Sequence, residues 1–255
     1  MIFPDTPWPP VNDMIKLKPG TVTAVASLPG VGRSTFTLNM ALHNALQGKR
    51  TLYTSSEIVG EELTSKAVTA LYGIDLRHRE TPLGGWESFS ARTKQQVESI
   101  PLHLHEAIET TPEKAYTAGT VGADRKGQRL TLWFLDSLTH FSAFTTDGRH
   151  RDHEHGAEKA MAQLRRIAEQ EQIAVVVTAR AENEEDGQPL TLEHVEHAVA
   201  TLSDQVLMLH REGAWWTSDV SDTATVDRLK PPHEGTAVLR FLPRLCRFAH
   251  FGINV

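Results

Sequence analysis

The chain has 255 residues, which suits one large α/β domain or two small ones, and 40% of them are hydrophobic, enough for a substantial core. The net charge of -6 excludes a global basic surface for nucleic acid, so any such surface must be local. The single cysteine, Cys246, excludes an internal disulfide and is typical of a reducing compartment. The first residues lack the pattern of a secretory signal, and no stretch reaches the roughly 18 apolar residues of a membrane span. We therefore expect a cytoplasmic protein without a membrane partner.

Apolar patterning predicts strands that alternate with helices, after an irregular, proline-rich lead-in over residues 1–20. The expected strands cover residues 21–27, 51–55, 102–105, 130–136, 173–178 and 206–210, followed by strand-like segments at 223–230, 235–242 and 247–251. One expected helix begins near residue 36 and ends near Gly48, and others cover 60–72, 86–100 and 157–170. The glycine-rich stretch 118–129 and the polar stretch 141–156 indicate loops. This order implies one α/β domain over residues 21–255, with a mostly parallel sheet and antiparallel strands at its C-terminal end.

The stretch around residues 21–42 has the order strand, glycine loop, helix that a phosphate-binding loop requires. Gly30 and Gly32 allow a tight turn that brings backbone N–H groups close to an anion, and the dipole of the following helix points to the same place. In the pattern G-x-x-x-x-G-K-[ST], Ser27 replaces the first glycine, Arg33 replaces the lysine, and Ser34 is the hydroxyl that binds Mg²⁺. Arg33 keeps the positive charge as a planar fork, a change that nucleotide binding could survive and that could slow hydrolysis. The expected nucleotide-binding residues are Pro29, Gly30, Val31, Gly32, Arg33, Ser34 and Thr35; the alternative is a glycine turn without a ligand.

Two acidic residues follow predicted strands of the same sheet. Asp136 ends a buried apolar run, where a P-loop ATPase has the aspartate that holds Mg²⁺ through water. Glu57 follows the second strand, where a carboxylate can orient and deprotonate an attacking water. Ligands of such sheets bind at the carboxyl ends of the strands, so both acids point to a site for ATP and Mg²⁺. Their structural alternatives are an acid at a helix N-terminus for Glu57 and a strand-end turn for Asp136.

Several short motifs follow one another between residues 17 and 241. They are Leu17–Gly20, Pro29–Asn39, Ser55–Ile58, Phe134–Asp136, the strand at 173–178 and Gly235–Phe241. In this order they resemble the C-terminal, RecA-like motor domain of the DnaB replicative helicase family, over residues 5 to 251. The resemblance implies a P-loop NTPase that forms a ring, uses Mg²⁺ and ATP, and moves along single-stranded DNA. It also implies that Glu57 is the catalytic base.

The sequence departs from the pattern of that family after the P-loop as well. Arg180 stands where a strand of the family ends in a glutamine that senses the nucleotide. Arg228 and Lys230 stand where a Lys-x-Arg pair reaches the phosphate of a neighbouring subunit, with the two cations exchanged; we expect one of them to act in trans. The acidic run over residues 182–186 falls in the loop expected to face DNA, where it would repel phosphates.

Two functions remain open from the sequence. The first is a DnaB-like, DNA-dependent ATPase of DNA replication, whose partners are ATP, single-stranded DNA and further copies of itself in a ring. The second is a catalytically weak, nucleotide-binding regulator of a replicative helicase or an initiator, which Arg33 and the other departures motivate. A recombinase-like or circadian-clock-like RecA relative fits the sheet but fits the Ser-Ser-Glu57 motif less well.

Overall fold

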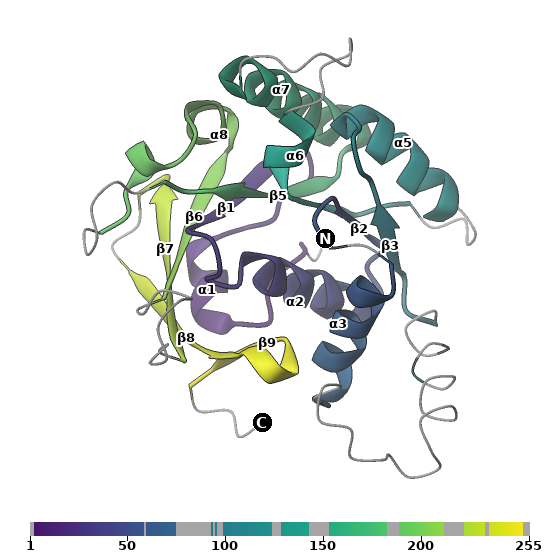
Figure 1. Cartoon of the computed structure of the whole chain (residues 1–255), viewed down its shortest axis with the longest axis vertical. Coiled ribbons are helices and arrows are strands. Elements are labelled where there is room, and N and C mark those ends of the chain that lie inside the picture. The colour runs from purple at the N-terminus through teal and green to yellow at the C-terminus, as the bar shows by residue number, and fades with distance from the viewer. Residues whose placement is uncertain are drawn as a thin grey trace.

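The computed structural model describes residues 3–58, 60–74, 93, 95, 99–123, 129–142, 153–182, 189–211, 222–232 and 235–251. Nine strands in these ranges form one sheet, in the order β3-β2-β4-β5-β1-β6-β7-β8-β9 (Figure 1). They are β1 Val22–Ser27, β2 Thr51–Ser55, β3 Leu102–Glu106, β4 Leu132–Asp136, β5 Ala174–Arg180, β6 Gln205–Arg211, β7 Thr223–Lys230, β8 Thr236–Leu242 and β9 Arg247–His250. The first six pair in parallel and the last three are added antiparallel. This topology confirms the predicted α/β sheet with an antiparallel C-terminal end.

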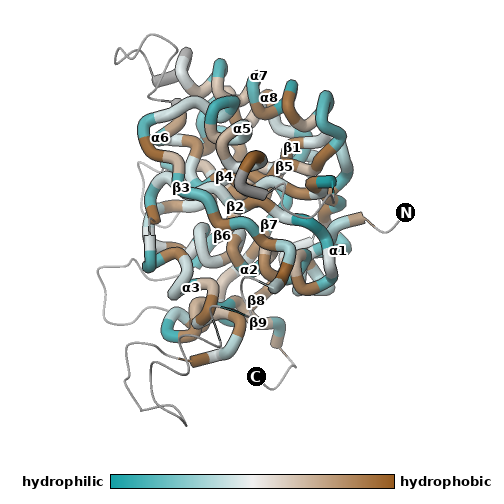
Figure 2. Tube along the Cα trace, turned by 90° about the vertical axis from the view of Figure 1, so that its right-hand side faces the viewer, coloured by the Kyte–Doolittle hydropathy of each residue, from teal (hydrophilic) through white to brown (hydrophobic). Residues whose placement is uncertain are grey.

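Helices cover both faces of the parallel strands, which explains why β1, β2 and β4 are buried along their whole length. On one face lie α2 (Arg33–Leu46) and α3 (Glu61–Tyr72); on the other lie α5 (Pro112–Ala123), α6 (Leu138–Ser142), α7 (His153–Glu171) and α8 (His197–Leu202) (Figure 1). Neighbouring residues of a strand enter different cores: Phe134 belongs to the core that contains Phe36 of α2, whereas Trp133 belongs to the core that contains Leu164 of α7. Along α7, hydrophilic and hydrophobic residues alternate, as expected for a helix with one buried face (Figure 2). None of the helices in the described ranges has the length and hydropathy of a bilayer-spanning segment.

The antiparallel end of the sheet curls around, so that β9 lies against α2 (Figure 1). Phe248 of β9 packs its ring edge-on against Phe36 of α2, with the ring centroids 5.6 Å apart, and stacks on Phe241 of β8 at 4.6 Å. Asn39 of α2 accepts a hydrogen bond from the Phe248 N–H at 2.8 Å and donates one to the Cys246 carbonyl at 2.9 Å. The C-terminal strands are therefore joined to the helix that follows the glycine loop.

The lead-in before β1 belongs to the same core and contains a short helix, α1 (Pro9–Met14). The sequence predicted an irregular segment because of its prolines, but Pro9 and Pro10 occupy the first turn, where a missing N–H costs no hydrogen bond. Trp8 is 1% exposed and stacks on Phe36 at 4.4 Å between ring centroids. Its indole Nε1 donates to the Phe248 carbonyl at 2.9 Å. Trp8 thus joins the lead-in to both α2 and β9.

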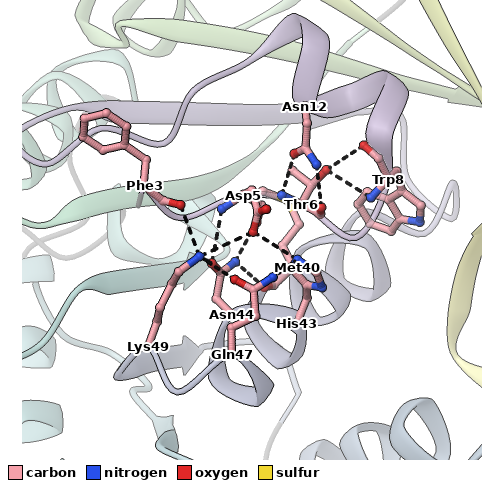
Figure 3. Close-up of polar contacts among 10 residues, drawn as sticks. All are labelled: Phe3, Asp5, Thr6, Trp8, Asn12, Met40, His43, Asn44, Gln47 and Lys49. Carbon is pink, nitrogen blue, oxygen red and sulfur yellow. Dashed lines mark hydrogen bonds and ion pairs between the residues drawn. The ribbon is translucent and has the colours of Figure 1, made fainter. Parts of the chain in front are cut away.

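Polar contacts hold the start of the lead-in against the end of α2 (Figure 3). The Asp5 carboxylate lies 3.0 Å from His43 Nε2 and 3.4 Å from Lys49 Nζ. Asn44, which is buried, donates from Nδ2 to the Asp5 carbonyl at 2.7 Å. The lead-in therefore contacts the C-terminal end of α2, whereas the glycine loop leads into its N-terminal end.

Two predicted loops contain helical residues. Residues 118–123 belong to α5. Gly119 lets this helix approach β2 closely, since a Cβ at this position would lie 2.9 Å from Leu52 Cδ2. The glycine therefore serves helix–sheet packing and not a loop. In the stretch 141–156, α6 extends to Ser142 and α7 begins at His153, while 143–152 lie outside the described residues, as does most of the helix expected over 86–100.

Candidate nucleotide-binding site

The glycine loop connects β1, the middle strand of the nine-stranded sheet, to α2. Gly30 and Gly32 have φ values of 77° and 109°, in the left-handed region that favours glycine. Gly32 is the N-cap of α2, and no side chain among the described residues forms a capping hydrogen bond to this helix. The N–H groups of its first turn can therefore bind an anion, which the helix dipole also favours. Residues Pro29 to Thr35, the predicted nucleotide-binding residues, form this turn from strand to helix.

The Arg33 side chain turns back from the first turn of α2 toward the ends of two strands. Its Nη1 donates to the Ser27 carbonyl at 3.2 Å and to the Ala179 carbonyl at 2.7 Å. The Nε atom is buried without a hydrogen-bond partner among the described residues. Burial lowers the pKa of the guanidinium from its ordinary value, and the nearby carboxylates of Asp136 and Glu57 oppose that shift. The structure thus brings the predicted P-loop cation close to both predicted acids.

Asp136 ends β4 as a fully buried carboxylate, 0% exposed. Its Oδ2 accepts a hydrogen bond from the Tyr53 hydroxyl of β2 at 2.9 Å, and its Oδ1 accepts one from Thr178 Oγ1 of β5 at 2.7 Å. Both strands that flank β4 therefore supply a donor to this carboxylate. Such pairing is what allows an acid to be fully buried at the end of an apolar strand.

Glu57 lies in the turn that follows β2, beside the turn that follows β4. The Ser137 hydroxyl donates to Glu57 Oε1 at 2.6 Å, and His140 Nδ1 of α6 lies 4.0 Å from the same oxygen. The Ile58 N–H donates to Ser55 Oγ at 2.9 Å, which stabilises the turn. The Glu57 side chain is 37% exposed, so it is held by Ser137 and still reaches solvent.

The predicted trans-acting cations lie at the opposite edge of the sheet from the glycine loop, where the parallel strands begin. Lys230 pairs with Val206 at the start of β6, whereas the glycine loop follows the end of β1. Lys230 Nζ donates to the Ala200 and Thr201 carbonyls at 2.8 Å each, and Arg228 Nη1 donates to the Met14 carbonyl. Within one chain neither cation joins Asp136 and Glu57, and their action on a neighbouring subunit stays a prediction.

At the carboxyl edge, Arg180 lies opposite Ser27 in the pairing of β5 with β1 and is exposed. Its positive charge further lowers the pKa of Arg33, after the larger effect of burial. Arg180 therefore adds a second cation beside the glycine loop. Of the acidic run over 182–186, residues 183–186 lie outside the described residues.

Sequence reasoning missed several residues that support the site. Besides Tyr53, Thr178 and Ser137, Arg211 at the end of β6 donates from Nη2 to the Gly30 carbonyl at 2.9 Å, and its guanidinium carbon lies 4.6 Å from the Phe241 ring centroid. For Tyr53 and Thr178 a signal existed, because a polar residue inside an apolar strand needs a buried partner. Ser137 and Arg211 lie at strand ends, where polar residues are common, so the sequence gives no signal that they support the site.

We expect Gly32→Ala to destabilise the protein more than Gly48→Ala, by about 1–3 kcal/mol, the usual cost of overpacking. Both glycines have positive φ, so both variants carry the backbone cost. A Cβ on Gly32 would lie 3.1 Å from Phe241 Cζ and 3.1 Å from Phe248 Cζ, whereas a Cβ on Gly48 meets nothing within 4 Å. Urea unfolding of the two variants measures the difference. Equal losses of stability would contradict this role for the two rings.

The donor set fits a nucleotide with Mg²⁺. One phenol oxygen, that of Tyr53, lies 2.9 Å from Asp136 Oδ2 and 3.3 Å from the Ser34 carbonyl, so the two predicted metal-holding residues are close to each other. A serine hydroxyl and a carboxylate are oxygen donors of the kind that Mg²⁺ prefers, with several waters retained. A glycine loop after the middle strand, with one acid at the end of β4 and another just after β2, is the arrangement of a RecA-like P-loop domain.

Comparisons with known proteins identify the family. The family model described as the DnaB-like helicase C terminal domain matches residues 9–250, so the chain belongs to this family. The structure is similar to a solved structure of an ATPase domain, with a TM-score of 0.77 and 14% identity over 92% of this chain and 86% of that chain. It is also similar to a chain of "The Structure Of A DnaB-Like Replicative Helicase And Its Interactions With Primase", with a TM-score of 0.76 and 13% identity over 92% of this chain. The matched part is 58% of that second chain. A comparison with curated protein sequences gave no match.

Proposed function

We propose that this chain binds ATP with Mg²⁺ and hydrolyses it as the motor domain of a DnaB-like, DNA-dependent ATPase in DNA replication. The observation that carries the proposal is the convergence of Arg33, Asp136 and Glu57 beside a glycine loop at one edge of the sheet. A fold alone would leave function open, because one fold serves many reactions. Charged groups of the kinds that an ATPase needs for phosphates, a metal and an attacking water lie close together here, which supports the proposal.

In this proposal each residue has one task. The N–H groups of residues 29–35 bind the phosphates, and Arg33 contacts the β- and γ-phosphates after it leaves the Ser27 and Ala179 carbonyls. Ser34 and Asp136 would hold Mg²⁺, which when bound neutralises negative charge on the phosphate oxygens. Glu57 orients the attacking water and accepts its proton on Oε2, because Oε1 accepts the hydrogen bond of Ser137.

The proposed partners follow from the family. Single-stranded DNA stimulates the activity, and further copies of the chain form a ring in which Arg228 or Lys230 of one copy reaches the nucleotide of the next. Either cation must first release its backbone carbonyls, those of Met14 for Arg228 and of Ala200 and Thr201 for Lys230. A second replication protein is the remaining partner class.

The test is ATP turnover of the purified protein with and without single-stranded DNA, for the wild type and for Arg33→Lys. We expect DNA-stimulated turnover in the wild type and a change of less than about tenfold in Arg33→Lys, because both side chains carry the phosphate-binding charge. Arg33→Ala is the matched loss of charge, and we expect it to weaken ATP binding. No turnover in any form, with ATP binding also absent, would refute the proposal.

A second function is favoured by the position of the Arg33 side chain. Its guanidinium is already hydrogen-bonded to two backbone carbonyls, and a planar fork does not reproduce the point charge of the family lysine. On this reading the chain is a nucleotide-binding regulator of a replicative helicase or an initiator. Negligible turnover in the wild type, with activity appearing in Arg33→Lys, would favour the regulator over the motor.

A further inference from the structure

Tyr53, which the proposed mechanism does not use, lies at the centre of a buried polar cluster. Its hydroxyl is 2.9 Å from Asp136 Oδ2, 3.3 Å from Thr37 Oγ1 and 3.3 Å from the Ser34 carbonyl. Tyr53 and Asp136 are 0% exposed, and Thr37 is 1% exposed. The phenol thus stands between the first turns of α2, which carry Ser34, and the end of β4, which carries Asp136.

The number of hydroxyl hydrogens in this cluster decides which group donates each hydrogen bond. Tyr53 has one hydroxyl hydrogen, and the ionised carboxylate of Asp136 is the strongest of its acceptors as well as the nearest. The phenol oxygen is then free to accept from Thr37, whose hydroxyl also lies 3.2 Å from the Arg33 and Ser34 carbonyls. On the other side, Thr178 donates to the second carboxylate oxygen. Asp136 is therefore oriented from both sides, by Tyr53 on the side of the glycine loop.

The hydroxyl of Tyr53 can be removed without removing its ring. A phenylalanine would keep the ring, which packs at 6.1 Å from Phe134 between centroids, and would remove only the hydroxyl.

We propose that Tyr53 is a positioning residue that orients Asp136 relative to Ser34 and so sets the affinity of the site for Mg²⁺ with nucleotide. This inference rests on the proposed function, since it assigns Ser34 and Asp136 to the metal. Ser34 lies in the first turn of α2 and Asp136 ends β4, and the Tyr53 hydroxyl contacts both residues. Without that hydroxyl, Thr178 is the one hydrogen-bond donor left to the Asp136 side chain among the described residues, and the carboxylate can rotate away from the metal position.

The experiment measures equilibrium binding of a fluorescent ATP analogue to the full chain, in EDTA and across a Mg²⁺ titration. For Tyr53→Phe we expect the half-saturating Mg²⁺ concentration to rise about tenfold, the effect of one hydrogen bond to a charged acceptor, with binding in EDTA unchanged. The matched control is Thr54→Val on the same strand and the opposite face. It removes the acceptor of the Trp133 Nε1 hydrogen bond, 2.9 Å long, and should leave the Mg²⁺ dependence unchanged.

The remaining outcomes separate this inference from the proposed function. Wild-type protein that binds the analogue with a Mg²⁺ dependence identical to that of Tyr53→Phe would overturn only the role of Tyr53. Failure of Tyr53→Phe to fold, or equal losses of binding in EDTA and in Mg²⁺, would assign Tyr53 a purely structural role and also overturn the inference. Wild-type protein without Mg²⁺-dependent binding would overturn both the inference and the proposed function.

Discussion

Replacing Glu57 with glutamine should lower ATP turnover by about 100- to 10,000-fold, the range that one general base contributes, and leave ATP binding close to wild type. Glutamine has nearly the same shape and can still accept the Ser137 hydrogen bond through its carbonyl oxygen. It cannot take a proton from water at neutral pH. The chemical step should therefore slow while the site keeps its geometry. Phosphate release under saturating ATP and Mg²⁺ measures the effect, and binding of a fluorescent ATP analogue gives the affinity.

Glu62→Gln is the matched control for Glu57→Gln. Glu62 lies in the first turn of α3 and pairs with Lys66 at 2.9 Å, and its side chain is 65% exposed. A carboxylate so placed, on the solvent side of a helix, should have no effect on turnover. If Glu57→Gln retained wild-type turnover, Glu57 would not be the base, and the acid at this strand end would serve the turn alone.

Replacing Trp8 with alanine should lower the free energy of unfolding by about 3–5 kcal/mol, the usual cost of removing a large aromatic side chain from a core. Trp8 is almost fully buried, stacks on Phe36 of α2 and contacts Phe248 of β9. The variant loses these contacts and leaves the Phe248 carbonyl without its indole donor. Urea unfolding, followed by circular dichroism, measures the change.

Trp8→Phe separates packing from hydrogen bonding at this position. It keeps an aromatic ring against Phe36 and removes the Nε1 donor, so we expect a loss of about 1–3 kcal/mol, as for a buried acceptor left unpaired. A Trp8→Ala variant as stable as the wild type would mean that the lead-in does not contribute to the core. The same result would contradict the packing of Trp8 described above.

Local patterns predicted most of the strands. The ranges 51–55 and 223–230 coincide with β2 and β7, since alternating or continuous apolar residues between turn signals determine a strand with few alternatives. Helices containing glycine or proline were harder. Glycine and proline have low helix propensity. Gly119 is nevertheless part of α5 because the helix packs closely on the sheet there, and Pro9 is part of α1 because it lies in the first turn.

The candidate site divides in the same way. The glycine loop, Asp136 and Glu57 could be found from the sequence because each is defined by its place after a strand, and parallel strands bring their carboxyl ends to one edge. The partners of Asp136 could not, because Tyr53 is 83 residues away and Thr178 is 42 residues away. Which strands flank β4 depends on the order of the whole sheet.

By itself, then, the sequence determined most of the strands, the mostly parallel sheet and the glycine loop after the first strand, all of which depend on local spacing. Only the tertiary structure decided that Arg33 turns back to the Ser27 and Ala179 carbonyls and that the lead-in packs through Trp8 onto α2 and β9. These contacts join residues far apart in the chain. They form because burying a polar group costs free energy unless the folded sheet supplies its hydrogen-bond partner, and because burying an aromatic ring removes a large apolar surface from water.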